Sequence, residues 1–346
     1  MPDVQVAGHG IGLATAMHCL TQRGIGIQAG ADAVPASARG PLVMLGDAAQ
    51  ALLTDVFAGQ AQMAQMLAMA HPITRRIVRW GSDTAQCFAH SAVVVAADRL
   101  RDVLVGGQGV GSPMPAQFAL TATPGPDARL LRFGQREAAA APVMLQRHAD
   151  RSAAYVEALG AGWLFLIPTG GDAGWLLAVG ADPAEALRDS AVIADVVAEV
   201  GAVAGRFETA PRLADPCATA AHLTVGSAGL ALDPICGDGT ATAVRGGILA
   251  AAVAAAMVGA DRPALDPDHD GAALVGHYRL MLIAAMRRHL GTAWPFYTRG
   301  GTGAWWQAEA AALAQGHAWC TQQLAAAGEA RFVLAGDRLV ARGCAA

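Results

Sequence analysis

The chain opens with a short strand, a cluster of glycines and a helix, and this arrangement limits the fold more than any other feature. Residues 4–7 form an apolar strand, Gly8, Gly10 and Gly12 follow, and residues 13–22 have helical spacing. Glycines at such a turn allow backbone N–H groups at the start of a helix to approach a phosphate. The segment therefore predicts the first βαβ unit of an α/β, Rossmann-like domain.

The glycine turn departs from the usual dinucleotide fingerprint at two points. G-x-G-x-x-G has two residues before its third glycine, whereas one residue separates Gly10 from Gly12. The second strand, at residues 25–28, leads into Ala29 and Gly30, where an acidic side chain would bind the ribose hydroxyls. Taken alone, the turn is equally compatible with nucleotide binding and with a plain tight turn between a strand and a helix.

The composition excludes several classes of function. The chain has 346 residues, of which 54% are hydrophobic and 15% charged, enough to bury the core of one large α/β body with an inserted layer. All 24 basic residues are arginine, which excludes a mechanism that needs a lysine amine. The net charge is -4 and no arginine cluster exceeds a pair, which argues against a nucleic-acid partner.

The cysteines and the most apolar segment restrict the setting of the protein. Six cysteines lie far apart, without a C-x-x-C pair or histidines at metal-ligand spacing, so we predict no metal site and a reducing, cytoplasmic setting. The start of the sequence lacks the basic region of a secretory signal. Residues 246–260 are apolar but fewer than the roughly 18 that a membrane span needs. We expect a buried, alanine-rich helix there and no membrane partner.

Periodicity and turn residues place the remaining elements. Helices are expected at 48–57 with Asp47 as its cap, at 98–104, at 183–204 with Asp182 as its cap, and at 237–256, 277–290 and 303–327. Strands are expected at 75–80, 91–96, 117–123 and 222–226, with a meander at 152–158, 162–168 and 174–180, and loops at 29–41 and 106–115. The last 85 residues read as helices. In the final helix, a stripe at spacings of four and three predicts a buried face: Trp306, Ala310, Leu313, His317, Cys320 and Leu324.

The most specific motif lies where a short strand leads into the alanine-rich helix. Asp233, Pro234, Gly237 and Gly239 form D-P-x-x-G-x-G. The proline stiffens the turn, and the glycines leave backbone amides free to meet an electron-rich ligand at a helix N-terminus. An ordinary Gly/Pro turn before a helix is the alternative. The stretch resembles the carboxy-terminal flavin motif of the para-hydroxybenzoate hydroxylase fold, with Ser227 where that family has an acidic residue that binds the ribityl chain.

The order of elements also resembles that fold, and the run from Arg39 to Phe57, the meander and residues 297–306 are similar to flavoproteins that hydroxylate tryptophan side chains in quinone-cofactor maturation. The resemblance implies an FAD-binding domain (1–70, 98–150 and 213–260), a substrate-covering antiparallel sheet (71–97 and 151–212) and a C-terminal helical segment (261–346). FAD would bind at Gly8, Gly10, Gly12, Ser227 and the D-P-x-x-G-x-G residues. No catalytic residue is assigned.

The activity implied by the resemblance is that of an FAD-dependent monooxygenase. In that family, reduced flavin and O2 form a C4a-hydroperoxide that attacks an electron-rich aromatic ring, so the expected substrate is an aromatic small molecule or peptide, with a peptide tryptophan among the candidates. NAD(P)H or an external reductase would supply electrons. Two alternatives remain open: a degenerate flavoprotein fold that acts as a non-catalytic partner, and an FAD-dependent reductase or dehydrogenase.

Residues 162–168 also resemble the W-x-W-x-I-P signature of flavin-dependent halogenases, with Trp163 at the first tryptophan and Phe165 at the second. Those halogenases use a lysine to deliver hypohalous acid. Because the chain has no lysine, halogenation by that route is not expected. The plain alternative is that both rings pack on one face of a sheet.

Overall fold

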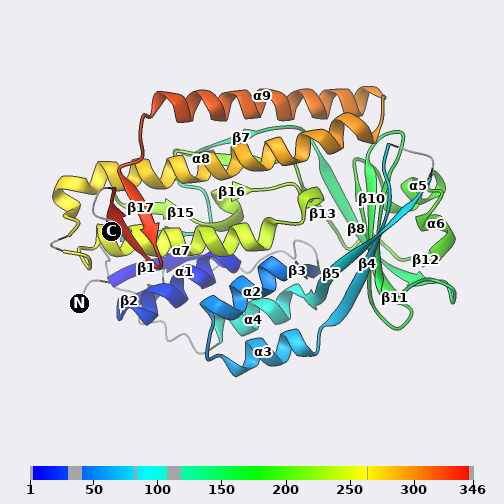
Figure 1. Ribbon diagram of the computed structural model, residues 1–346, viewed down its shortest axis with the longest axis horizontal. Helices are drawn as coiled ribbons and strands as arrows, with labels where there is room; N and C mark the ends of the chain where they lie inside the picture. Colours follow the sequence, from blue (N-terminus) through cyan, green and yellow to red (C-terminus); the bar gives the residue numbers. More distant parts are fainter. Residues whose placement is uncertain (1–2, 30–40, 82–83, 107–117, 263, 343–346) are drawn as a thin grey trace.

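The computed structural model describes residues 3–29, 41–81, 84–106, 118–262 and 264–342 (Figure 1). The helices are α1 (Ile11–Gln22), α2 (Asp47–Val56), α3 (Ala61–Ala68), α4 (Ala97–Val105), α5 (Pro183–Arg188), α6 (Ile193–Val196), α7 (Gly239–Met257), α8 (Pro267–Gly300) and α9 (Ala304–Ala326), with short 3-10 turns η1 (Gly226–Ala228) and η2 (Pro234–Cys236). The first nine strands are β1 (Asp3–Ala7), β2 (Gly26–Ala29), β3 (Leu42–Gly46), β4 (His71–Arg79), β5 (Gln86–Ala96), β6 (Phe118–Thr121), β7 (Arg129–Arg132), β8 (Glu137–Leu145) and β9 (Ala153–Ala158). The others are β10 (Trp163–Gly170), β11 (Ala173–Val179), β12 (Val197–Val200), β13 (Gly205–Glu208), β14 (Arg212–Asp215), β15 (His222–Thr224), β16 (Leu230–Ala231), β17 (Phe332–Ala335) and β18 (Arg338–Ala341).

A four-stranded parallel sheet contains the first strand of the chain, in the order β15-β6-β1-β2. The predicted strand, glycine turn and helix are confirmed as β1 and α1. Helix α7 packs against α1 and is buried along most of its length, as expected for a run rich in alanine, the residue with the highest helix propensity. The α/β class predicted from the sequence is therefore confirmed.

A second, nine-stranded sheet curves over the far end of the molecule (Figure 1), in the order β12-β8-β11-β10-β9-β4-β5-β3 with β13 on β8. The predicted meander is confirmed, since β9, β10 and β11 pair antiparallel in sequence order. Directly paired residues share a face of a sheet, and alternate residues of a strand do so too. The registers therefore place Phe165, Leu177 and Val156 on one face.

Helices α8 and α9 lie side by side along one edge and reach from the first sheet to the second (Figure 1). The stripe predicted for the final helix is confirmed, because its members are buried or half-buried. Helix α7 is long and apolar enough to cross a membrane by length and composition, but 61% of its most apolar window is buried inside the protein. It is therefore a core helix, as the sequence predicted.

Three local predictions are wrong. Residues 183–204 form α5, α6 and β12 instead of one helix; Asp182 does cap α5, accepting from the Ala184 N–H at 3.1 Å. Helix α2 is capped by Gly46, and the side chain of Asp47 accepts a hydrogen bond from the Ser91 hydroxyl instead. The last 85 residues also contain the β17–β18 hairpin. The loops predicted at 29–41 and 106–115 lie largely outside the described residues.

The nine-stranded sheet takes strands from more of the chain than the predicted sheet segments contain. Strand β3 and strand β8 both join it, although the ranges 1–70 and 98–150 were assigned to the FAD-binding domain. The domain boundaries themselves stay a prediction. Strands β3, β8, β10, β11 and β13 line one cavity together with Gly237 and Gly239, so the sheet approaches the D-P-x-x-G-x-G segment.

Candidate functional site

The first glycine turn joins β1 to α1 in a backbone conformation that favours glycine. Gly8 and Gly10 have φ values of 94° and 134°, which L side chains rarely adopt. A Cβ on Gly8 would lie 2.8 Å from the Ala122 side chain, whereas a Cβ on Gly10, the N-cap of α1, would meet nothing within 4 Å. The N-terminus of α1 is therefore open to a ligand at Gly10.

Gly12 has a different surrounding. A Cβ on Gly12 would lie 3.1 Å from the Gly226 Cα and from the Ala243 carbonyl oxygen, and a Cβ on Gly247 would lie 2.4 Å from the Gly12 carbonyl oxygen. Gly12 and Gly247 thus allow α1 and α7 to approach closely. The third glycine expected of the fingerprint is replaced by Leu13, which is buried in the core.

The second turn begins after β15. Gly226 has a φ of 68° and open space at its Cβ position, and Ser227 beside it is exposed. Gly237 has a φ of 67°, and a Cβ on Gly237 or on Gly239 would meet nothing within 4 Å. Gly239 is the first residue of α7. This second group of glycines therefore leaves a helix N-terminus open, as the motif predicted.

Asp233 lies at the start of this turn, but its side chain is only 1% exposed and is fully engaged by protein donors. One carboxylate oxygen accepts the Ile235 N–H at 2.9 Å. The other accepts from Arg136 Nε at 2.9 Å and from the Tyr297 hydroxyl at 2.6 Å. Asp233 therefore shapes the turn from within, whereas Gly237 and Gly239 present their backbone to the surface.

The network around Asp233 extends into the second sheet and both long helices. Arg136 also binds Glu309 of α9, and its guanidinium carbon lies 4.4 Å from the centre of the Tyr297 ring. Trp163 of β10 donates to the Tyr297 hydroxyl at 3.2 Å. Burial alone would lower the pKa of Arg136, but Asp233, Tyr297 and Glu309 raise it, so the guanidinium stays charged. Burial and the charge of Asp233 raise the pKa of Tyr297 well above its usual value, so the phenol stays protonated.

Three potential metal ligands meet behind the turn: Cys236, Asp238 and His289. The Asp233 N–H donates to His289 Nε2 at 2.9 Å, so neutral His289 carries its proton on Nδ1. That nitrogen faces the Asp238 carboxylate at 3.5 Å. Burial raises the pKa of the Cys236 thiol. Among the described residues, His289 Nδ1 and Asp238 Oδ1 are both buried without a hydrogen-bond partner. The absence of a metal site stays a prediction.

Asp238 sits between the two glycines that open α7, with its side chain 41% exposed. Burial would raise the pKa of Asp238, but the His289 side chain, the local backbone and the charge of Arg288 hold it below its usual value. The carboxylate is therefore ionised at neutral pH. It places one negative charge beside the open helix N-terminus.

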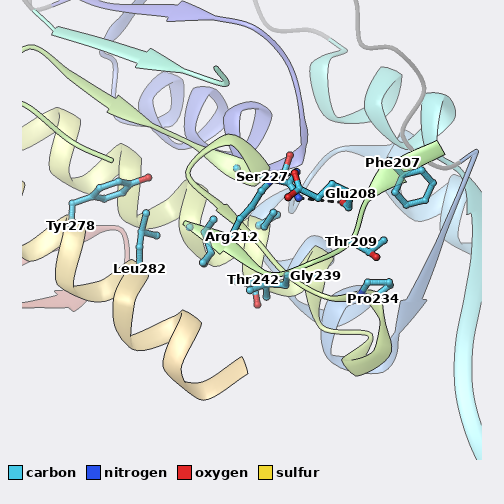
Figure 2. Close-up of a pocket in the computed structure, with 16 residues that line it drawn as sticks. Phe207, Glu208, Thr209, Arg212, Ser227, Pro234, Gly239, Thr242, Tyr278 and Leu282 are labelled. Carbon is cyan, nitrogen blue, oxygen red and sulfur yellow. Dashed lines mark hydrogen bonds and ion pairs between the residues drawn. The ribbon is translucent and has the colours of Figure 1, made fainter. Parts of the chain in front are cut away.

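Two cavities adjoin the second turn. One, of about 330 Å³, lies between the turn, α7 and α8 (Figure 2). In Figure 2 its labelled lining runs from Tyr278 and Leu282 to Phe207, with Pro234 and Gly239 also on its wall. The other, of about 290 Å³, lies between the turn and the inner face of the second sheet, and both share Phe207, Pro234 and Gly239. The turn thus forms a wall common to both cavities.

The second cavity is mainly apolar. Its sheet wall contains Phe165 and Ile167 of β10 with Trp175 and Leu177 of β11, and the opposite side contains Gly237 and Gly239. Alternation alone gave no direction for the three aromatic residues expected on this sheet, Trp163, Phe165 and Trp175. The structure places Phe165 and Trp175 in the cavity lining, whereas Trp163 is buried and donates to the Tyr297 hydroxyl.

Three of the eight residues predicted to bind FAD, Gly10, Gly237 and Gly239, have open space where a side chain would lie, and so does Gly226. A flat or extended ligand can therefore contact their backbone. Gly8 and Gly12 are packed against other backbone, and the role of all eight stays a prediction. Helix α1 begins directly after Gly10, and helix α7 begins at Gly239. The N-terminus of a helix favours electron-rich groups. FAD, when bound, would be held by these backbone positions. Ser227 provides a hydroxyl where the family has a carboxylate.

Sequence reasoning missed the four side chains that support Asp233 and the turn: Arg136, His289, Tyr297 and Glu309. A buried acidic residue in a turn requires a partner, which was the available signal. The sequence could not identify the partners, because they lie far away along the chain. Arg136 lies 97 residues before Asp233, and Glu309 lies 173 residues after Arg136.

No family model matches the sequence, and no curated protein matches it by sequence. Solved structures do match in fold. The peptidyl tryptophan dihydroxylase QhpG, essential for tryptophylquinone cofactor biogenesis, is 18% identical, with a TM-score of 0.67 over 89% of this chain and 78% of that chain. The myxobacterial chondrochloren halogenase CndH, an FAD-dependent halogenase, is 16% identical, with a TM-score of 0.68 over 89% and 85%.

A third match is HpxO of Klebsiella pneumoniae, a variant solved in complex with FAD. It is 14% identical, with a TM-score of 0.56 over 94% of this chain and 99% of that chain. Identities of this size show the fold alone. The resemblance found in the sequence is confirmed at that level: the chain has the FAD-binding fold of flavin-dependent monooxygenases and halogenases.

Proposed function

We propose that the chain is an FAD-dependent monooxygenase that hydroxylates an aromatic substrate. The observation that carries the proposal is the apolar cavity between the sheet face of Phe165 and Trp175 and the open glycines at the start of α7. Such a cavity holds an aromatic ring against whatever binds at the glycines. The peptidyl tryptophan dihydroxylase among the structural matches makes a peptide tryptophan the first substrate to test.

The chain's own residues would bind, orient and exclude water. FAD, when bound, would supply the activation of oxygen, which no protein side chain provides. Backbone N–H groups at Gly10, Gly237 and Gly239 would hold the cofactor, and the Asp233–Arg136 pair would fix the second turn. Phe165 and Trp175 would position the substrate ring and keep the cavity dry. The reductant, either NAD(P)H or an external reductase, and the cytoplasmic setting are part of the same proposal.

The absence of lysine from the sequence favours oxygenation over halogenation by the lysine route. A second function, a non-catalytic partner built on the flavoprotein fold, is favoured by a different observation. The position of the ribityl-binding acid holds Ser227, and the third fingerprint position holds Leu13. These two residues weaken contacts to FAD and leave the fold intact.

The first experiment is gel filtration of the full chain after incubation with FAD, followed by its visible spectrum. We expect flavin absorption to stay with the protein. Gly239→Val should reduce FAD affinity at least about ten-fold, because the new side chain occupies space where the cofactor meets the helix N-terminus. Gly276→Val is the control, since Gly276 also has open space at its Cβ position but lies in α8.

If the wild-type protein remains colourless, the oxygenase proposal is wrong and the non-catalytic partner is favoured. If FAD binds, peptides and small molecules with an indole or phenol ring are tested with a reductant under air. Product with one added oxygen supports hydroxylation. Tight FAD binding with reduction but no oxygenated product favours the reductase alternative.

A further inference from the structure

Strand β4 carries three arginines. Two of them pair with a carboxylate, and among the described residues the third does not. Arg75 pairs with Asp150 at 2.7 Å, and Arg79 pairs with Glu157 at 3.1 Å. Arg76 lies between them and points to the other face of the strand from Arg75. Among the described residues, no carboxylate oxygen lies within 4.0 Å of its guanidinium nitrogens.

The guanidinium of Arg76 has one neutral partner. Its Nη2 donates to His90 Nε2 at 3.2 Å, while its Nε is buried without a hydrogen-bond partner. Burial lowers the pKa of Arg76, and burial together with the charge of Arg76 lowers the pKa of His90. His90 therefore stays neutral and accepts. Asp47, which acts electrostatically on His90, already accepts from the Ser91 hydroxyl at 2.5 Å.

These two groups line a cavity of about 400 Å³ between the β4–β5 hairpin and α8. Its aromatic lining consists of Trp80, Phe88 and Phe296. Trp80 is held by the hydrogen bond from its Nε1 to the Phe296 carbonyl oxygen at 2.8 Å, and the two rings meet at 88°. Phe88 and Phe296 are 50% and 40% exposed. Within the part of the chain that the structure describes, the cavity thus combines a cation that has no counter-ion with aromatic side chains that are partly exposed.

The cavity opens on the same face of the second sheet as the cavity beside the second turn. Val78 of β4 pairs with Val156 of β9, which pairs with Phe165 of β10. Arg76 is two residues before Val78 and shares its face. The lining residues of the two cavities do not overlap, so they are separate cavities on one face of the sheet.

We propose that this cavity binds a small aromatic carboxylate, with the carboxylate on Arg76 and the ring against Trp80, Phe88 and Phe296. An arginine fork matches a carboxylate in shape and charge. An anion would also remove the cost of holding a partly buried cation without a counter-ion. The aromatic walls select a ligand with a ring over a simple inorganic anion. This site is distinct from the FAD site and does not depend on the proposed activity.

The test is isothermal titration of the full chain, without FAD, with benzoate, benzamide and inorganic phosphate. We expect benzoate to bind at least about ten-fold more tightly than its neutral analogue benzamide, because a hydrogen bond to a charged group contributes more than a neutral one. Phosphate should bind more weakly than benzoate, since it lacks the ring. Arg76→Gln should weaken benzoate binding by the same factor or more, and Arg75→Gln should leave it unchanged.

Folding is checked on the same variants by thermal unfolding. Arg76→Gln should unfold at the wild-type temperature or about 1–3 °C above it, since an unpaired, partly buried charge is removed. Phe88→Ala is a second variant at a residue half exposed to solvent, and it should weaken benzoate binding about three- to ten-fold while leaving benzamide and benzoate in the same order.

Four results would overturn the proposal. The first is no binding of benzoate to the wild-type protein, and the second is benzoate binding to Arg76→Gln as tight as to wild type. The third is benzamide or phosphate binding as tightly as benzoate. The fourth is loss of benzoate binding in Trp175→Ala, in the cavity beside the second turn, but not in Arg76→Gln, which would assign the ligand to that cavity instead.

Discussion

The two glycine turns of this protein are built in different ways. The first, from Gly8 to Gly12, is fixed by neighbouring backbone: Gly8 lies against Ala122, and Gly12 lies against α7. The second is fixed by a buried charge network around Asp233, whose members are Arg136, which directly precedes β8, Tyr297 of α8 and Glu309 of α9. Close packing therefore holds one turn and hydrogen-bonded charges hold the other, although both leave glycines open at a helix N-terminus.

This difference means that the two turns should respond to different changes. The first turn should be destabilised when side-chain volume is added, because the closely packed backbones leave no space for a larger side chain. The second should fail when a charge is removed, because its partners would remain buried and ionised. Four experiments, from the largest expected effect to the smallest, can break or sharpen this contrast.

The largest effect is expected for Arg136→Met. The substitution would leave the buried carboxylates of Asp233 and Glu309 without their shared cation, and we expect the free energy of unfolding to fall by about 3–5 kcal/mol. Urea denaturation measures it. Arg132→Met is the control: Arg132 is half exposed in its pair with Glu208, and its loss should cost under about 1 kcal/mol. Equal losses in the two variants would show that the network does not support the second turn.

Gly247→Ala tests the packing of the first turn. The added Cβ would lie 2.4 Å from the Gly12 carbonyl oxygen, so α1 and α7 must separate, with a loss of about 1–3 kcal/mol in the free energy of unfolding. Gly246→Ala is the matched control in the same helix, because its Cβ would meet nothing within 4 Å. That control should be stabilising by roughly 0.5–1 kcal/mol. A loss at Gly246 as large as that at Gly247 would contradict the packing argument.

Tyr297→Phe removes one hydroxyl from the network and keeps the ring over Arg136. The hydroxyl donates to Asp233 at 2.6 Å and accepts from Trp163 at 3.2 Å, so we expect a loss of about 1–3 kcal/mol, toward the lower end because Arg136 still pairs with Asp233. Chemical denaturation of Tyr297→Phe and Arg136→Met under the same conditions ranks their losses in the free energy of unfolding. A loss greater than that of Arg136→Met would mean that the phenol, not the guanidinium, is the main partner of Asp233.

The smallest effect is expected for Asp238→Asn, which should change how the stability of the protein depends on pH. The folded-state pKa of Asp238 is below its usual value of 3.8, so its stabilising contribution is present above that value and is lost as the pH falls through the folded pKa. The wild-type protein should therefore lose more stability between neutral and acidic pH than the variant does. Parallel thermal unfolding from pH 6 down to about pH 3 checks this, with pH values chosen around the usual aspartate pKa. Identical slopes would show that the His289 contact does not stabilise the ionised carboxylate.

Sequence reasoning located both turns because each is a local pattern. The glycines, the proline and the helices that follow them lie within a few residues of one another, and a helix start depends on that short range. The same reasoning was wrong about residues 183–204. There the apolar periodicity suggested one helix, but the bond from Ser190 to Glu157 and the pairing of β12 with β8 divide the segment. Tertiary contacts of this kind override local propensity.

The sequence by itself determined the α/β class, the two glycine turns, the buried alanine-rich helix and the absence of lysine chemistry. Only the tertiary structure decided which side chains support the second turn and which face the cavities. The physical reason is distance along the chain: Arg136 and Asp233 are 97 residues apart, and Asp233 and Tyr297 are 64 apart. Backbone conformation depends on near neighbours, whereas the partner of a buried charge is whichever group the completed fold brings within a hydrogen bond.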